Sequence, residues 1–173
     1  MKYYNGFSLK DEEYLFKEFI TDTDYTVCGF SYGAINAFKK VQQELKDGNR
    51  VDRLILLSPA FFQTKTKQFK KLQLMGYKRD KDSYLRGFLS SCFLPYSEVS
   101  VKTQETTLEQ LDELLNYEWV VSELKELEQK GVKIEIYLGG EDKIIDVAGA
   151  RELFLDVGSV TYIKDGNHFL ICK

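Results

Sequence analysis

The sequence predicts an α/β protein with a mainly parallel sheet of about five to six strands. Short apolar runs of strand length alternate with amphipathic helical patterns along the chain. The chain has 173 residues, which is enough for one domain with a substantial core. Hydrophobic residues make up 43% of it, and no stretch has the composition of a disordered segment. Alternating strands and helices imply right-handed crossovers, so functional groups are expected beyond the carboxyl ends of the strands.

Five runs rich in apolar, β-branched and aromatic residues, each bounded by turn residues, predict strands. They are residues 2–4, 25–29, 53–57, 133–138 and 160–163. Helical periodicity lies between these runs. It covers residues 11–20, 32–45, part of 64–92, a pair of helices within 107–130, and 147–155.

One segment, from about residue 61 to residue 117, breaks the alternation of strand and helix. It is rich in Lys, Gln, Ser and Thr and contains Pro95. We interpret it as a helical lid inserted into a single domain that spans residues 1–173. With the strands in simple order, the crossover helices would cover one face of the sheet. The other face would be left to the lid, the termini or another copy of the chain, and the oligomeric state is not predicted.

The chain shows no sign of export or membrane insertion. The N-terminus MKYYNGF lacks an apolar core of signal-peptide length, and the longest apolar runs are too short to cross a bilayer. We therefore expect a cytoplasmic protein that does not bind membranes. The three cysteines, Cys28, Cys92 and Cys172, match neither a disulfide framework nor a zinc ligand pattern. We expect reduced thiols, no metal and no cofactor.

A candidate nucleophile lies within residues 25–37, which predict a strand, a G-x-S-x-G turn and an amphipathic helix. This order is typical of a nucleophile elbow, in which a serine occupies a strained turn between strand and helix. Gly29 and Gly33, two residues before and after Ser31, let the backbone pass without steric clash. The alternative is a glycine-rich turn with an incidental serine. We identify Ser31 as the candidate nucleophile.

The only histidine of the chain, His168, follows the last predicted strand. A serine hydroxyl is a weak nucleophile and needs a base within hydrogen-bond reach, usually a histidine. A lone histidine is more often a surface or turn residue. Here, however, its place fits the chain order Ser, Asp, His of proteins with a nucleophile elbow. His168 is the expected general base.

An acid is expected after the strand at 133–138, where two glycines lead directly into acidic residues. A carboxylate there can accept a hydrogen bond from the second imidazole nitrogen and stabilise the imidazolium. We select Asp142, with Glu141 as the main alternative. The other nearby acids are interpreted as a helix cap and surface residues, namely Asp146, Asp156 and Asp165.

Acyl transfer also needs N–H donors aimed at the developing oxyanion. The backbone N–H of Tyr32, directly after the nucleophile, is one expected donor. The second is the N–H of Phe7 in Asn5-Gly6-Phe7, which follows the first strand and where Gly6 allows close backbone approach. A plain turn is the alternative for this stretch.

Four motifs together resemble the signatures of α/β-hydrolases. They are Asn5-Gly-Phe, Gly29-Phe-Ser-Tyr-Gly33, Gly140-Glu-Asp-Lys-Ile-Ile-Asp and Gly166-Asn-His, and they span nearly the whole chain. The short length, the start at the oxyanion strand and the elbow GFSYGA specifically resemble the BioV-type pimeloyl-[acyl-carrier protein] methyl ester esterases of biotin synthesis. The resemblance implies a minimal α/β-hydrolase that releases methanol from a methyl pimeloyl chain held by acyl-carrier protein. It also implies a triad of Ser31, Asp142 and His168, with an oxyanion hole formed by Phe7 and Tyr32.

The chain departs from the usual α/β-hydrolase pattern at three points. Asn5-Gly6 stands where His-Gly is usual, and Asp146 stands where a proline usually follows the acid. Only 24 residues separate Gly6 from Ser31, so one strand and one helix are expected to be missing.

Charge is unevenly distributed although the net charge is only -3. Residues 98–128 hold nine acids against two cations, whereas eight cations lie between residues 65 and 86. Acyl-carrier proteins are acidic, so a cationic lid would steer and orient one; a solvated helix face is the alternative. The negative net charge disfavours nucleic acid as a partner. The expected partner-binding cations are Lys65, Lys67, Lys70, Lys71, Lys78, Arg79, Lys81 and Arg86.

Two other functions stay open from the sequence. The same triad would serve a general short-acyl carboxylesterase or thioesterase. The missing elements would also fit a non-catalytic binding protein on a hydrolase scaffold. Apolar lid residues such as Phe69 and Phe88 would line a channel for an acyl chain or belong to the ordinary core.

Overall fold

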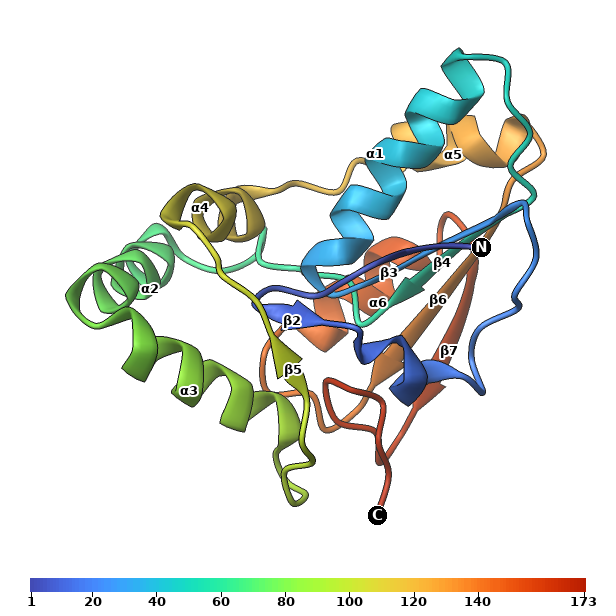
Figure 1. Cartoon of the computed structure of the whole chain (residues 1–173). Helices are drawn as coiled ribbons and strands as arrows, with labels where there is room; N and C mark the ends of the chain where they lie inside the picture. The colour runs from blue at the N-terminus through green and yellow to red at the C-terminus, as the bar shows by residue number, and fades with distance from the viewer.

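A central sheet of five parallel strands organises the molecule (Figure 1). It is described from a computed structural model that covers residues 1–173. The strand order is β1-β3-β4-β6-β7. The strands are β1 (Lys2–Tyr4), β3 (Thr26–Phe30), β4 (Arg53–Leu57), β6 (Lys133–Gly139) and β7 (Ser159–Ile163). All five strands predicted from the sequence are confirmed, with each boundary within one residue of the prediction.

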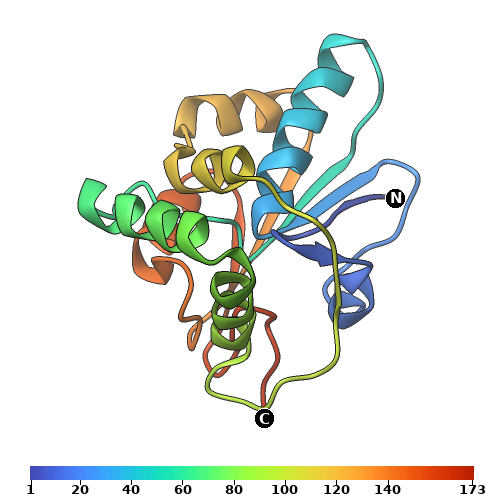
Figure 2. The same cartoon turned by 60° about the vertical axis from the view of Figure 1, so that its left-hand side comes forward.

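Three crossover helices pack on one face of the sheet (Figures 1 and 2). They are α1 (Tyr32–Lys46), α5 (Val121–Gln129) and α6 (Val147–Phe154). Helix α1 follows β3 directly and lies against β3 and β4, whereas α5 and α6 lie against β6. Their buried side chains recur at helical spacing, as Ala34, Phe38 and Val41 do in α1, so each helix presents one apolar stripe to the sheet.

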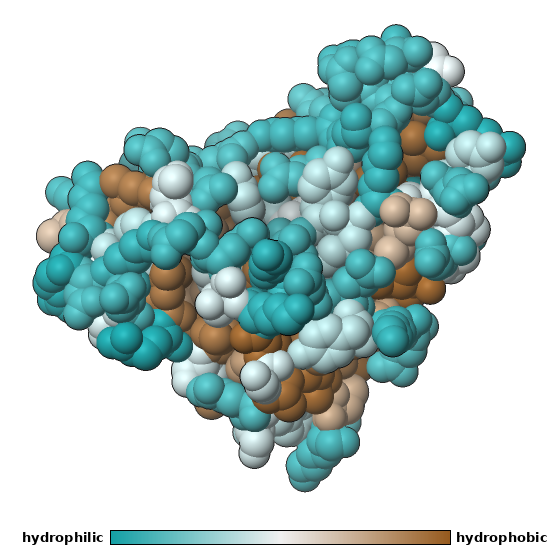
Figure 3. Space-filling model, in the orientation of Figure 1, coloured by the Kyte–Doolittle hydropathy of each residue, from teal (hydrophilic) through white to brown (hydrophobic).

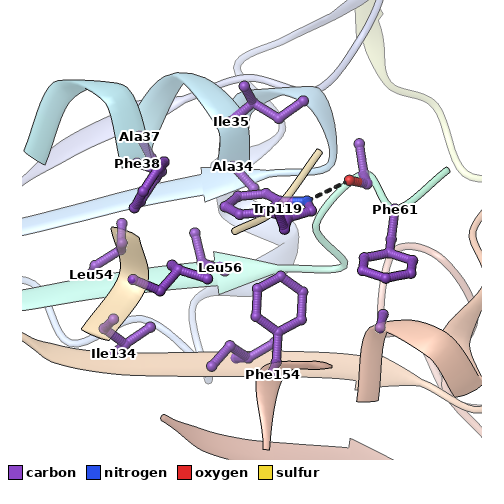
Figure 4. Packing of buried hydrophobic residues seen from close by; sticks show 14 of the residues in the cluster. Ala34, Ile35, Ala37, Phe38, Leu54, Leu56, Phe61, Trp119, Ile134 and Phe154 are labelled. Carbon is purple, nitrogen blue, oxygen red and sulfur yellow. Dashed lines mark hydrogen bonds between the residues drawn. The ribbon is translucent and has the colours of Figure 1, made fainter. Parts of the chain in front are cut away.

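The larger hydrophobic core lies between these helices and the sheet and contains 28 buried residues. Successive residues of a strand point to opposite faces, so Leu54 and Leu56 of β4 and Ile134 of β6 all point toward this core (Figure 4). Phe154 of α6 packs in the same core, close to Leu56 in the view of Figure 4.

Trp119, in the connection between α4 (Leu108–Asn116) and α5, joins the parts of this core. Its ring centroid lies 5.6 Å from that of Phe38 in α1 and 5.2 Å from that of Phe154 in α6. Its indole N–H donates to the carbonyl oxygen of Ala60 at 2.8 Å, the dashed line of Figure 4. The indole therefore fixes the chain just beyond β4 to two helices of the covered face.

The opposite face of the sheet is covered without a crossover helix. Ile55 and Leu57 of β4 point to this side and belong to a second cluster of 10 buried residues. The cover comes from segments near both termini and from the last turn of α3 (Lys81–Phe93), through Leu9, Phe16, Cys92, Phe93, Phe169 and Leu170. Of the three covers considered from the sequence, the inserted segment and the termini both contribute.

Between β4 and β6 the chain leaves the sheet and forms an insertion at the carboxyl ends of the strands (Figures 1 and 2). It contains α2 (Lys67–Arg79), α3, the short strand β5 (Lys102–Thr103) and α4. The side chain of Thr66 caps α2, and Thr107 forms a capping box at the start of α4. We call residues 61–117 the insertion; its action as a lid stays a prediction.

Two local features differ from the sequence prediction. The helix expected over residues 11–20 is only a short 3-10 helix, η1 (Glu12–Phe16), and it begins after a left-handed residue, Asp11 with φ 57°. The strand β2 (Leu9–Lys10) pairs antiparallel with β5, a small sheet that was not predicted because two-residue strands carry no periodicity. Only β2 and η1 lie between β1 and β3, in agreement with the short spacing from Gly6 to Ser31.

None of the helices combines the length and the apolar composition needed to cross a bilayer. All three cysteines are free; Cys28 and Cys92 are buried and Cys172 is exposed.

Candidate active site

Ser31 lies on the sharp turn between β3 and α1. Its backbone, with φ 53° and ψ -115°, has a conformation that costs a non-glycine residue energy and is typical of strained functional positions. Its N–H donates to the carbonyl oxygen of Leu57 at 2.9 Å, and its own carbonyl accepts from the N–H of Ala60 at 3.1 Å. Gly33 has no room for a side chain, because a Cβ there would lie 2.0 Å from the carbonyl oxygen of Tyr4. The ends of β1 and β4 therefore hold the turn in its strained shape.

Two hydrogen bonds connect Ser31, His168 and Asp142. Nε2 of His168 lies 3.0 Å from Oγ of Ser31, and Nδ1 lies 2.6 Å from Oδ2 of Asp142. His168 is 1% exposed and Ser31 is 2% exposed. A carboxylate beside Nδ1 favours the tautomer with its proton on Nδ1, which leaves Nε2 as an acceptor facing the hydroxyl. The structure thus brings together three residues that the sequence holds far apart.

Asp142 is held by the turn that follows β6. Its Oδ1 accepts from the N–H of Ile144 at 2.7 Å and from that of Ile145 at 3.3 Å, which leaves Oδ2 for the imidazole. At the end of β6, a Cβ on Gly139 would lie 2.3 Å from the carbonyl oxygen of Asn167. The loops that carry the acid and the histidine therefore pack backbone against backbone.

The other acids considered from the sequence lie away from the imidazole. Glu141 is partly exposed and pairs with Lys143 at 2.9 Å. Asp146 caps α6 by accepting from the N–H of Gly149 at 3.2 Å. The remaining two are exposed, namely Asp156 and Asp165.

Asn167 holds the loop of His168, a role that the sequence analysis did not identify. The residue is fully buried, and its amide nitrogen donates to the carbonyl oxygen of Phe93 at 2.9 Å. Its Oδ1 accepts from the N–H groups of Phe169 at 3.0 Å and Ile171 at 3.1 Å. The bond to Phe93 ties the loop to the last turn of α3, and the other two fix the shape of the loop around His168. Gly166-Asn-His was recognised as a motif, but no local pattern reveals a partner 74 residues away.

The N–H groups expected to bind an oxyanion have no partner within the protein fold. The N–H of Phe7 has no hydrogen-bond acceptor. The N–H of Tyr32 lies in the first turn of α1, where no preceding carbonyl of the helix can accept it. The loop after β1, which carries Phe7, touches the elbow, because Gly33 packs directly on the carbonyl oxygens of Tyr4 and Asn5. Both donors therefore come from backbone in contact with the elbow of Ser31.

The side chain of Tyr32 links the elbow to the insertion. Its hydroxyl donates to Oε2 of Glu113 in α4 at 2.5 Å, and Lys39 forms an ion pair with the same carboxylate. Burial, together with this hydrogen bond to a carboxylate, raises the pKa of Tyr32 well above its usual value. The hydroxyl therefore stays protonated and acts as a donor.

A cavity of about 580 Å³ lies among α2, α3 and α4, within the size range of small-molecule sites. Arg79 and Lys143 contribute positive charge to its wall. Phe88 and Ile144 line it and also pack against both core clusters, and the N–H of Ile144 donates to Oδ1 of Asp142. The other apolar lining residues are Phe62, Phe69, Tyr84, Leu111, Leu114 and Leu115. On the face shown in Figure 3, hydrophobic surface is exposed near the insertion helices and is surrounded by hydrophilic residues.

The eight cations singled out in the sequence lie on α2, on α3 or just before α2. Only Lys81 among them forms a salt bridge, with Glu105 at 2.6 Å, and only Arg79 lines the cavity. Helix α2 also exposes two apolar side chains, Leu72 at 53% and Met75 at 54%. The outer surface of α2 is therefore both basic and apolar.

The site combines a hydroxyl, an imidazole and a carboxylate in this order, with two unbonded backbone N–H groups nearby. Such an arrangement can carry out nucleophilic acyl transfer. The hydroxyl is the attacking group, and the other groups handle its proton and the developing charge. All of them come from loops at the carboxyl ends of the strands, where the parallel sheet was expected to collect them.

Solved structures share the fold over most of the chain. An esterase from Exiguobacterium antarcticum matches 83% of it with a TM-score of 0.62 at 19% identity. A bromoperoxidase from Bacillus anthracis matches 83% with a TM-score of 0.63 at 14% identity. Naproxen esterase (carboxylesterase NP) from Bacillus subtilis matches 84% with a TM-score of 0.55 at 17% identity.

The match covers only part of each of these proteins: 59% of the first, 60% of the second and 53% of the third. The chain thus spans a little over half of their length. No protein-family model and no curated protein sequence matches it. At these identities the likeness concerns the fold, and the fold class predicted from the sequence is confirmed: the chain has a minimal α/β-hydrolase fold.

Proposed function

We propose that this chain is a serine hydrolase that cleaves carboxylic esters. The observation that carries the proposal is the buried series of hydrogen bonds from Ser31 through His168 to Asp142. The strained backbone of Ser31 supports it, because such strain is typical of functional positions. Esterases among the structures of the same fold give further support.

In acylation, Oγ of Ser31 attacks the ester carbonyl carbon while Nε2 of His168 takes the hydroxyl proton. The carbonyl oxygen becomes an oxyanion, stabilised by the N–H groups of Phe7 and Tyr32. As the bond to the alkoxy oxygen breaks, the imidazolium returns the proton to that oxygen and the alcohol leaves. Water then attacks the acyl-serine by the same proton transfers, which releases the acid and restores the hydroxyl. Asp142 stabilises the imidazolium in both halves.

For the substrate we propose the methyl ester of a pimeloyl chain carried by acyl-carrier protein, as the resemblance to BioV-type esterases implies. Hydrolysis would yield the pimeloyl carrier protein and methanol. The cavity supports this choice, because its apolar wall suits the methylene groups of an acyl chain. Its lining residue Ile144 donates its N–H to Asp142, so one wall of the cavity adjoins the residue that holds the imidazole.

The outer surface of α2 supports an acidic partner such as acyl-carrier protein. Its cations lack carboxylate partners within the chain, so their charge is available to a second molecule. The exposed side chains of Leu72 and Met75 add apolar area among these charges. Opposite charge on the partner would speed association and orient the complex.

Replacing the nucleophile tests the hydrolase proposal. Ser31→Ala is expected to lower kcat on p-nitrophenyl butyrate by at least roughly 10³-fold while the protein stays folded. A fluorophosphonate probe should label the wild-type protein and not this variant. Ser58→Ala is the matched control, since Ser58 is buried at the end of β4 and its hydroxyl has no partner. An unlabelled wild-type protein would favour a non-catalytic scaffold.

Charge reversal on α2 separates the carrier-linked substrate from a general ester. Lys67, Lys71 and Lys78 are exposed and do not line the cavity. Their combined replacement by Glu should lower kcat/KM for the methyl pimeloyl carrier protein at least roughly tenfold and leave p-nitrophenyl butyrate hydrolysis unchanged. The control reverses three exposed cations on and directly after α1 and α5, namely Lys46, Lys125 and Lys130. Equal effects on both substrates would favour a general short-acyl esterase or thioesterase.

A further inference from the structure

A buried carboxylate, Glu12, binds the loop that carries the N–H of Phe7. Glu12 is the first residue of η1 and is 0% exposed. Its Oε1 accepts from the N–H of Gly6 at 2.7 Å and from the hydroxyl of Tyr3 at 3.2 Å, while its Oε2 has no partner. Burial raises the pKa of Glu12 above its ordinary value, and the hydrogen bond from Gly6 acts in the opposite direction. Keeping a carboxyl group at this place is costly for the fold.

A second hydrogen bond between the same two segments runs in the reverse direction. Oδ1 of Asn5 accepts from the N–H of Asp11 at 3.2 Å. The two segments are thus joined by two hydrogen bonds: the side chain of Glu12 accepts from the N–H of Gly6, and the side chain of Asn5 accepts from the N–H of Asp11. Ser8 and Asp11 have φ values of 63° and 57°, in the left-handed region that residues other than glycine seldom adopt. Backbone of this kind persists only where surrounding contacts determine it.

These contacts set the direction of the N–H of Phe7. The carbonyl of Gly6 and the N–H of Phe7 belong to one planar peptide group and point in opposite directions. The carbonyl oxygen of Gly6 accepts from the N–H of Leu9 at 3.1 Å, which fixes the orientation of the peptide group between Gly6 and Phe7 with its oxygen toward Leu9. Glu12 holds the preceding peptide group, between Asn5 and Gly6, by accepting a hydrogen bond from the N–H of Gly6. With both neighbouring groups fixed, the N–H of Phe7 points away from the loop and has no acceptor.

We propose that Glu12 is a positioning residue, which holds the loop after β1 so that the N–H of Phe7 is aimed at the oxyanion of the ester transition state. The inference rests on the proposed hydrolase function and extends it to a residue outside the triad. It also gives Asn5 a role at the place where His-Gly is usual in α/β-hydrolases, namely to hold Asp11, the residue directly before η1.

The test compares Glu12→Ala with Glu12→Gln on p-nitrophenyl butyrate. An oxyanion donor acts mainly in the transition state, so Glu12→Ala should lower kcat by roughly 10²- to 10³-fold and change KM by less than about threefold. A boronic acid, which forms a tetrahedral adduct with serine, should bind correspondingly weaker. Glu12→Gln keeps an oxygen to accept from Gly6 and should restore kcat to within roughly tenfold of the wild-type value.

The matched control is Glu44→Ala. Glu44 is also a mostly buried carboxylate, and it binds Lys2 of β1 and Asn49, away from the loop. Its loss should lower stability and leave kcat unchanged at a temperature where the protein is folded. If Glu12→Ala does not fold, Asn5→Ala takes its place, since it breaks only the second hydrogen bond of the pair; it should lower kcat and leave KM unchanged.

An unchanged kcat in the folded Glu12→Ala or Asn5→Ala variant overturns the inference, as does a Glu12→Gln variant as inactive as Glu12→Ala. Failure of the proposed function looks different, because the wild-type protein itself would then show neither esterase activity nor fluorophosphonate labelling.

Discussion

Replacing Asp142 by asparagine is informative because the structure dictates how the new amide would sit. Oδ1 of Asp142 accepts from the N–H groups of Ile144 and Ile145 at 2.7 and 3.3 Å. These two donors select the oxygen of an amide at that place. The amide nitrogen then takes the position of Oδ2, 2.6 Å from Nδ1 of His168. A donor would thus replace the acceptor that the imidazole now faces.

A donor beside Nδ1 forces the imidazole into the other tautomer, with its proton on Nε2. That nitrogen lies 3.0 Å from Oγ of Ser31 and would no longer accept the hydroxyl proton. In serine proteases with the same triad, this exchange lowers kcat about 10⁴-fold. At about 1.36 kcal/mol for each factor of ten, the transition state loses about 5.5 kcal/mol of stabilisation. We expect a loss of this size here, because the two N–H donors keep the loop in place.

The assay is steady-state hydrolysis of p-nitrophenyl butyrate near neutral pH, with urea unfolding to show that the variant is folded. Glu141→Gln is the control, since Glu141 lies next in sequence but pairs with Lys143 at the surface. It should change kcat by less than about threefold. A folded Asp142→Asn variant that loses less than tenfold, or a Glu141→Gln variant that loses as much, would refute the assignment of the acid.

Two further predictions concern stability. Trp119→Phe should lower the free energy of unfolding by roughly 2–4 kcal/mol, because it leaves the carbonyl of Ala60 without its donor and the space of the indole partly empty. Urea unfolding measures this loss, with Tyr117→Phe as the control. A loss under about 1 kcal/mol would contradict the packing described for Trp119. Hydrogen bonds from Lys2, Lys40 and Asn49 lower the pKa of Glu44 to about 2. Since the unfolded chain binds this proton near pH 4.3, the contribution of Glu44 is fully present above about pH 5 and is lost as the pH falls toward 2. Glu44→Gln should therefore lose less stability than the wild-type protein between pH 6 and pH 3, and an identical loss in both proteins would show that the carboxylate is not involved.

The elements of the sheet could be predicted because their signals are local. The run at 53–57 has four successive apolar residues after Arg53, and the structure makes it the central strand, with these four buried. The elbow was recognisable for the same reason, since Gly29, Ser31 and Gly33 lie within five residues and the strain of the turn involves only that stretch. Asp142 could be preferred over Glu141 only by analogy, because both follow the same strand.

Other features depend on contacts between distant parts of the chain and leave no local pattern. The segment at 11–20 has helical periodicity, yet only a 3-10 turn forms, because residues 8–12 are drawn into hydrogen bonds with the loop after β1 and with β5. Asn is common in turns, so the sequence marks Asn167 only as a turn residue. Its hydrogen bond to the carbonyl of Phe93 depends on how α3 packs against this loop.

By itself the sequence determined the order of the five sheet strands and their crossover helices, the place of the elbow, and its serine and histidine, and it left Asp142 and Glu141 as the two candidate acids. These depend on periodicity and on turn chemistry, which act over a few neighbouring residues. Only the tertiary structure decided what covers the second face of the sheet, which carboxylate oxygen faces the imidazole, and that Glu12 holds the loop of Phe7. The reason is that a buried polar group takes its partner from whatever the folded chain brings within about 3 Å, and sequence distance does not limit that choice.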